Sequence, residues 1–215
     1  MGLSNRTTLW TISLVGCSLS ATSPAGINPT CAESFSDDCA QTVEAAISTG
    51  QTADAQRVLE SACGANELTA CVMLAVHQQS ADGIPQDLSS ASRLFVRADQ
   101  GGLGSGSYHA AVTHHRGIGT PTDLILAEHY YERACTRDYE PGCYDLGLLL
   151  TQGEVPINGH KAGRAFLASC GLGNAAACIN VTSLIEQDLY EAPEPYTVES
   201  LKERACQLLP EACGL

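Results

Sequence analysis

The chain has 215 residues, with 24 acidic against 11 basic side chains and a net charge of −13. So strong a negative charge repels phosphate backbones, which excludes nucleic-acid binding as an expected function. Aromatic residues make up only 5% of the chain and cysteines number 11, so disulfides formed in an oxidising compartment are expected to supplement the apolar core.

Residues 1–16 are predicted to be an export signal, because their apolar segment is too short to span a bilayer. The segment 14–17, Leu-Val-Gly-Cys, resembles the lipobox of bacterial lipoproteins, which are cleaved before the cysteine and acylated on its thiol. The resemblance implies lipidation of Cys17. The alternative is ordinary signal cleavage near Ser20 or Ala25, which leaves no lipid. Either outcome removes Cys17 from thiol chemistry and leaves ten cysteines, an even number.

Residues 17–30 are predicted to form a flexible tether, because Ser, Thr, Pro and Gly dominate the segment and cannot bury a core. No other segment of the sequence is long and apolar enough to predict a transmembrane helix. A lipid on Cys17 is therefore the expected membrane attachment. The predicted location is the outer membrane, facing the periplasm or the cell surface.

From residue 31 to 215 the sequence repeats with a period of about 36 residues. Prolines, an Asp or Asn two positions later, and alanines recur in register with pairs of cysteines. Asp99 and Ser107 stand where one cysteine pair is missing. The five pairs that remain are Cys31 and Cys39, Cys63 and Cys71, Cys135 and Cys143, Cys170 and Cys178, and Cys206 and Cys213.

Each repeat is predicted to be a pair of antiparallel helices. The apolar residues between Ala91 and Ala98 fall on one helical face, and Asp87 is a suitable residue to begin that helix. Residue types that tolerate the left-handed conformation follow each first-cysteine position by three, and would end the first helix. They are Asn66, Gly102, Asp138 and Gly173. The predicted fold is an all-α solenoid of about five disulfide-stapled helix hairpins.

A disulfide across the turn of each hairpin would staple its two helices together. Each closed loop could contribute up to ~2–3 kcal/mol on the chain-entropy model. The repeat that carries Asp99 and Ser107 has no such staple, and its turn at 101–106 contains four glycines. This unstapled repeat is expected to be the softest part of the solenoid.

The segment Gly83–Asp87, the helix with Ala91 and Ala98, and the segment Tyr144–Gly147 resemble Sel-one-like repeats, which are relatives of tetratricopeptide repeats. The cysteine pairs eight apart resemble the cysteine-rich branch known as the hcp β-lactamase family. The resemblance covers residues 31–215. It implies a right-handed superhelix that recognises other proteins, often at bacterial envelopes. As an alternative function, it implies binding or slow hydrolysis of penicillins.

No catalytic site, metal site or cofactor is expected. A serine β-lactamase needs a Ser-x-x-Lys pair, and neither Lys161 nor Lys202 has a serine three positions before it. Three histidines share the unstapled repeat, where a weak zinc site is an alternative to ordinary surface or half-buried side chains. They are His109, His114 and His115.

Basic residues recur at two positions of the predicted first helices, one helical turn apart. The first column is Arg57, Arg93, His129 and Arg164, and the second column is Arg97, Arg133 and Arg204. Stacked repeats would turn these columns into a basic strip that binds an acidic protein or peptide. The alternative is a solvated face that pairs with local acids such as Glu60 and Glu132. The predicted function is an exported, lipid-anchored scaffold for protein or peptide binding.

Overall fold

The computed structural model describes residues 27–213, so the predicted signal and Cys17 lie outside the described residues. Within this range the chain forms helices and no strand, which confirms the all-α class. None of these helices is both long and apolar enough to cross a bilayer. The helices are α1 (Asp37–Ser48), α2 (Thr52–Gly64), α3 (Leu68–Ser80), α4 (Leu88–Gln100), α5 (Gly104–Arg116), α6 (Leu124–Thr136), α7 (Glu140–Thr151), α8 (Gly159–Gly171), α9 (Ala175–Glu186) and α10 (Val198–Leu208), with short 3-10 helices at Pro29–Ala32 and Pro210–Ala212.

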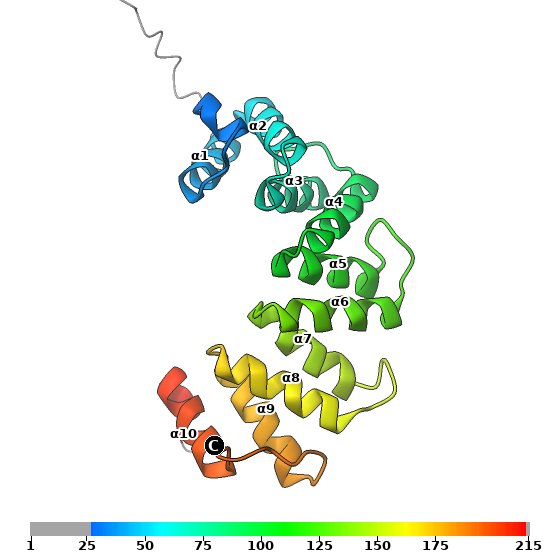
Figure 1. The fold of residues 1–215 in the computed structure, drawn as a ribbon, viewed down its shortest axis with the longest axis vertical. Coiled ribbons are helices and arrows are strands. Elements are labelled where there is room, and N and C mark those ends of the chain that lie inside the picture. The colour runs from blue at the N-terminus through cyan, green and yellow to red at the C-terminus, as the bar shows by residue number, and fades with distance from the viewer. Residues whose placement is uncertain (1–26, 214–215) are drawn as a thin grey trace, which may run out of the picture.

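The helices stack as antiparallel hairpins in a curved array (Figure 1). The complete hairpins in the described range are α2–α3, α4–α5, α6–α7 and α8–α9. At the two ends, α1 stands as a lone second helix and α10 as a lone first helix. Each helix packs chiefly on the helices before and after it in the chain. The predicted solenoid is therefore confirmed, as four complete repeats between two half-repeats.

The first helices α4, α6 and α8 begin at side-chain caps that recur with the repeat, whereas α2 has none. Asp87 accepts a hydrogen bond from the backbone N–H of Ser90 at 2.8 Å, and Asp123 caps α6 in the same way at 2.9 Å. Asn158 caps α8 at 2.9 Å. These bonds satisfy an N–H that has no partner within the helix. The first helices end as predicted at residues of positive φ, which are Asn66, Gly102, Asp138 and Gly173.

Small side chains let the two helices of each hairpin approach closely. A Cβ atom added at Gly106 would lie 2.5 Å from the Cβ of Ala98, and one added at Gly142 would lie 2.4 Å from the Cβ of Ala134. Both distances are shorter than any normal contact between carbon atoms. Gly106 therefore lies within α5 as a packing residue and does not indicate a loose hairpin.

All five cysteine pairs predicted from the repeat are bonded in the structure. The Cα–Cα distances across them lie between 4.4 and 5.5 Å, within the range that disulfides adopt. Four of the bonds join the end of one helix or 3-10 segment to the first turn of the next helix, and the fifth joins the last turn of α10 to Cys213, which directly follows the second 3-10 helix. The disulfides therefore staple hairpins internally, and none of these five links one hairpin to another.

The unstapled repeat is closed by hydrogen bonds where the other complete repeats of the described range have a disulfide. Ser107 Oγ donates to Asp99 Oδ1 at 2.8 Å, and both side chains are almost fully buried. Arg137 Nη1 lies 2.8 Å from the same carboxylate oxygen and also donates to Ser107 Oγ, while Arg133 Nε lies 3.1 Å from it. These four side chains form the Asp99 junction. A buried carboxylate with this many donors is both paired and hydrogen-bonded.

The folded domain begins before residue 31, which corrects the predicted boundary of the tether. Ile27 is only 9% exposed and packs in the same apolar cluster as Cys31 and Val43. Asn28 accepts a hydrogen bond from the backbone N–H of Thr30 and caps the first 3-10 helix. The polar composition of the predicted tether gave no sign of this contact, because Ile27 is a single apolar residue among polar ones.

Candidate functional site

The second column of arginines joins successive repeats. Arg97, Arg133 and Arg204 each lie 34 residues after a first-cysteine position of the preceding repeat (97 − 63, 133 − 99 and 204 − 170). Arg204 donates from Nε to the carbonyl oxygen of Cys170 and from Nη2 to that of Gly171, both at 3.1 Å. These carbonyls belong to the last turn of α8, where a cation is favoured by the helix dipole.

The other two arginines of this column also contact the end of the first helix in the repeat that precedes each of them. Arg133 pairs with Asp99, as described above, and Arg97 approaches Cys63 Sγ at 3.6 Å and Asn66 Oδ1 at 3.5 Å. We call the three residues of this column the clamp arginines. Their guanidinium groups are hydrogen-bonded within the stack, so they are less available to a partner than the predicted basic strip requires.

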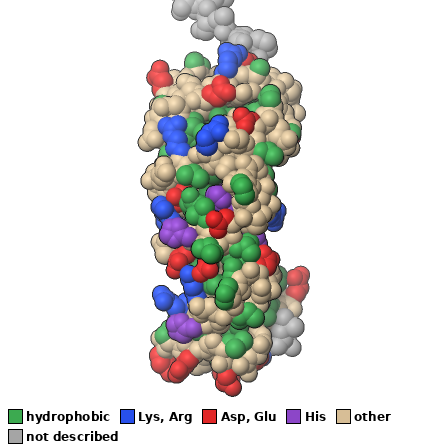
Figure 2. Space-filling model, turned by 90° about the vertical axis from the view of Figure 1, so that its right-hand side faces the viewer, with side chains coloured by type: hydrophobic (Ala, Val, Ile, Leu, Met, Phe, Trp, Pro, Cys, Tyr) green, Lys and Arg blue, Asp and Glu red, His purple; other side chains and the backbone are tan. Residues whose placement is uncertain are grey.

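The first column is also less available than a basic strip requires. Arg57 pairs with Asp54 on its own helix, and Arg93 donates to a serine four residues earlier at 2.8 Å. His129 lies beside the following tyrosine, with 6.2 Å between ring centroids. Arg164 forms no hydrogen bond or ion pair with any residue in the range 27–213. Basic and acidic side chains are interspersed on the face seen in Figure 2, so that face carries no continuous basic stripe.

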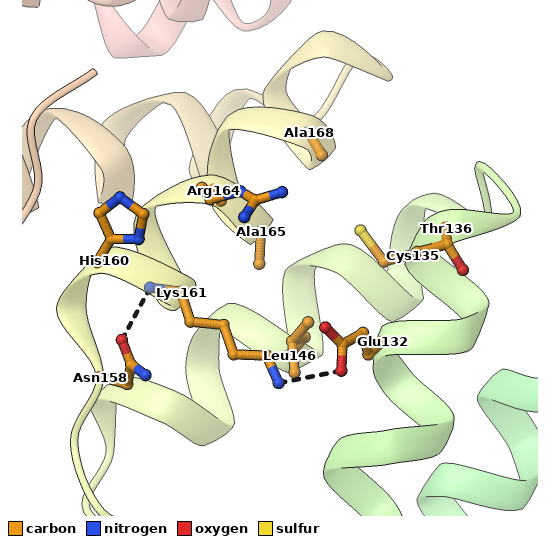
Figure 3. A pocket seen from close by; sticks show the side chains of 10 residues that line it. All are labelled: Glu132, Cys135, Thr136, Leu146, Asn158, His160, Lys161, Arg164, Ala165 and Ala168. Atoms are coloured by element: carbon orange, nitrogen blue, oxygen red, sulfur yellow. Dashed lines mark hydrogen bonds and ion pairs between the residues drawn. The ribbon is translucent and has the colours of Figure 1, made fainter. Parts of the chain in front are cut away.

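A cleft of about 580 Å³ lies between α6 and α8, where the clamp column is interrupted. The column position in α8 is Ala168 (133 + 35, or 204 − 36), whose methyl group cannot bridge to α6. Ala168 lines one wall and the last residues of α6, Cys135 and Thr136, line the other, with Leu146 between them (Figure 3). The cleft therefore opens at the place that a clamp arginine fills elsewhere.

Lys161 lies across one end of the cleft and is held by two carboxylates of α6. Its Nζ lies 2.7 Å from Glu128 Oε1 and 3.0 Å from Glu132 Oε2. Burial lowers the pKa of Lys161, but these hydrogen bonds outweigh that effect, so that the pKa is raised. The chain's other lysine, Lys202, pairs with Glu186 at 3.2 Å. A lysine that holds its proton this firmly cannot act as a general base at neutral pH.

A second cleft, of about 620 Å³, adjoins the first across α8. The two share His160 and Arg164, and the second is completed by the segment 190–194, which includes Glu191 and Glu194. Arg164 projects from α8 over the space between α8 and α6 (Figure 3). Together the two clefts form a groove that crosses the third and fourth complete repeats. We take this groove as the candidate site.

A separate group of polar side chains lies between α5, α6 and α7, and the repeat pattern of the sequence did not predict its contacts. His115 lies 3.1 Å from Tyr131 Oη through Nδ1 and 2.7 Å from Glu154 Oε2 through Nε2. Burial, aided by the nearby Asp145, raises the pKa of Tyr108 to about 12, and burial also raises the pKa of Asp145. None of these residues lines the two clefts described above, so we assign them to packing between repeats.

The histidines of the unstapled repeat are packed against aromatic rings. His109 stacks on Phe95 with 4.8 Å between ring centroids, and His114 stacks on Tyr130 at 5.6 Å. Burial lowers the pKa of His109, because the charged imidazolium would lose its hydration. Among residues 27–213, no group of three or more His, Cys, Asp or Glu side chains is arranged to hold a metal ion.

Two solved structures share this architecture. A Sel1 repeat protein from Oxalobacter formigenes superposes with a TM-score of 0.63 at 18% identity, over 80% of this chain and 76% of its own length. A protective antigen present in uropathogenic Escherichia coli strains, which displays an SLR fold, gives a TM-score of 0.65 at 18% identity, over 84% of this chain and 40% of its own. The fold is that of Sel1-repeat proteins. At this identity the likeness extends to the fold alone.

Two curated proteins are similar to this chain in sequence. Cytochrome c oxidase assembly factor 7A of Xenopus laevis is 28% identical over 133 residues, which cover 59% of this chain and 58% of that protein. Cytochrome c oxidase assembly factor 7 of Xenopus tropicalis is 26% identical over 163 residues, covering 72% and 71%. The chain thus spans less than two thirds of the first of these relatives. No family model matches the sequence, and neither relative is named as a β-lactamase.

Proposed function

We propose that this chain is an exported, lipid-anchored scaffold that binds a segment of a partner protein in the cleft between α6 and α8. The interruption of the clamp column at Ala168 carries the proposal. It leaves an open cleft lined by two successive repeats, at a point where three other interfaces are closed by an arginine. The cleft combines apolar side chains at Leu146, Ala165 and Ala168 with polar and charged side chains around them, and such concave sites between elements are common places for ligands to bind.

The fold and the relatives support a scaffold that holds a partner without modifying it. A Sel1-repeat stack offers an extended surface assembled from equivalent positions of successive repeats. The two curated relatives are named as assembly factors, and neither name denotes an enzyme. Lys161 is engaged by two carboxylates, which argues against the penicillin-hydrolysing alternative, since that chemistry needs a group able to accept a proton.

The cleft can be tested with a plug. Replacing Ala168 by tryptophan should fill the space between α6 and α8, while replacing Ser61, the exposed residue at the same column position in α2, should not. Peptides selected from a display library on the purified wild-type protein should bind Ala168→Trp at least about tenfold more weakly and Ser61→Trp unchanged. Equal binding to wild type and both variants would refute the cleft as the binding site.

The export part of the proposal rests on the five disulfides, which persist in oxidising compartments, and on the Leu-Val-Gly-Cys segment that ends at Cys17. Mass spectrometry of the protein expressed in a bacterium should find a mature N-terminus at Cys17 that carries acyl chains. Cys17→Ala should lose the lipid and leave the membrane fraction. An unmodified N-terminus between residues 21 and 26 would contradict the anchor.

A further inference from the structure

We propose that the cleft between α6 and α8 binds an arginine side chain presented by the partner protein, in the place that the chain's own clamp arginine fills at the other interfaces. This inference rests on the proposed function, because it names the group that the scaffold recognises. It differs from the acidic partner expected from the two basic columns, most of whose arginines the structure engages within the stack.

The repeats themselves provide the template for this ligand. At the α8–α10 interface, Arg204 donates to the carbonyl oxygens of Cys170 and Gly171. The same positions one repeat earlier are Cys135 and Thr136 (170 − 35 and 171 − 35), and both line the cleft. The two interfaces thus present equivalent acceptors. One has an arginine of the chain in front of it, and the other has Ala168.

The acceptors are also free to take a second hydrogen bond. The carbonyl oxygen of Cys170 already accepts the backbone N–H of Gly173 at 3.1 Å, and still accepts Arg204. The carbonyl oxygen of Cys135 accepts the backbone N–H of Asp138 at 3.0 Å in the same way. A carbonyl oxygen has two lone pairs, so a guanidinium group can join the existing turn contact at α6 as it does at α8.

The local charge favours a cation over an anion. The cleft itself is lined by the cations Lys161 and Arg164 and by the carboxylate of Glu132, a sum of +1 with histidine neutral (two positive and one negative). Lys161 is paired with both Glu128 and Glu132, and Glu191 and Glu194 line the adjoining cleft. The two clefts and these partners together sum to −2 (two positive and four negative). The last turn of α6 adds the negative end of its helix dipole, and the chain as a whole carries −13. A basic segment would therefore be attracted at long range and retained at short range.

The probe for the test is N-acetyl-arginine amide, titrated into the isotope-labelled full chain and followed by NMR. Saturable shifts should be confined to the end of α6 and to the α8 residues that line the cleft. The citrulline derivative, which has the same shape without the charge, should bind at least about tenfold more weakly. Shifts that do not saturate, or an equal response to citrulline, would overturn the inference. Tighter binding of N-acetyl-glutamate amide would overturn it in favour of an acidic partner.

Three variants give an independent readout. Ala168→Arg should restore the clamp column, raise the melting temperature by about 2 °C or more above that of Ala168→Met, and abolish the response to the arginine probe. Ser61→Arg adds the same charge at the same column position in α2 and should leave the probe response unchanged. An Ala168→Arg variant that still binds the probe, or that melts below Ala168→Met, would show that a guanidinium does not fit between α6 and α8.

The inference and the proposed function can fail separately. If the tryptophan plug at Ala168 abolishes peptide binding but the selected peptides contain no arginine that their binding requires, the cleft is a docking site for another group. The arginine inference then fails and the proposed function stands. If the plug has no effect on any selected peptide and the probe does not bind, both fail. Selected peptides that lose binding when one arginine is replaced by citrulline support both.

Discussion

Replacing Arg133 and Arg137 together by methionine should lower the free energy of unfolding by about 3 kcal/mol. The two arginines bring three of the four contacts in the Asp99 junction, and the carboxylate they neutralise is only 1% exposed. Methionine keeps most of the side-chain volume, so that the change removes charge and hydrogen bonds more than packing. Thermal and urea unfolding of the two proteins, compared side by side, measure the effect.

Arg93→Met is the matched control, because Arg93 donates only to a serine on its own exposed helix face and its loss should cost less than about 0.5 kcal/mol. Adding Asp99→Asn to the double variant should recover about 1–2 kcal/mol, since a neutral amide costs less to bury than an unpaired carboxylate. A double variant as stable as wild type, with no gain from Asp99→Asn, would show that water supports the carboxylate as well as the arginines do.

Removing the central staple should cost almost as much. Cys135→Ala with Cys143→Ala should lower the free energy of unfolding by about 2–3 kcal/mol, the value of closing a nine-residue loop. The pair Cys206→Ala with Cys213→Ala should cost less in global unfolding, because α10 is a lone helix at the end of the described stack that packs chiefly on α9 and its own 3-10 segment. Amide hydrogen exchange distinguishes the effects of the two pairs of substitutions. The first change should expose amides in α6 and α7, and the second only those of α10.

Equal effects of the two pairs on global unfolding would contradict this order, because the stack would then unfold as a single unit. Repeat proteins are stabilised by contacts between neighbours, so a terminal half-repeat is expected to open alone. The lone position of α10 at the end of the described stack makes it the most sensitive place for this comparison.

The period of the sequence was enough to predict the helix pairs, because caps, left-handed turns and cysteine pairs are local signals. Asp123 and Asp138 mark the beginning and the end of α6 without reference to any distant residue. Local signals could not predict the hydrogen bonds of the clamp arginines. Each of their acceptors lies about 34 residues away, and a column of equal residues looks alike whether it faces water or the preceding repeat.

The candidate site could not be predicted from the sequence for a related reason. The sequence shows that Ala168 breaks the column, but the break has a meaning only when the column is known to fill the space between first helices. Asp99 and Ser107 were likewise visible as substitutes for a cysteine pair. From the sequence, this substitution indicated only that a disulfide was missing. The two arginines that complete the junction belong to the next hairpin, so their contact with Asp99 could not be predicted from the repeat pattern.

The Asp99 junction also bears on the order in which the chain assembles. A newly made polypeptide has reduced thiols, so its five stapled turns must first form without covalent help. The junction needs no oxidant, and it draws its four side chains from α4, α5, α6 and the residue after α6. The four side chains of the junction can therefore pair before any enzyme oxidises the flanking cysteines. Among the complete repeats of the described stack, the one without a staple is thus the one whose closure does not depend on oxidation.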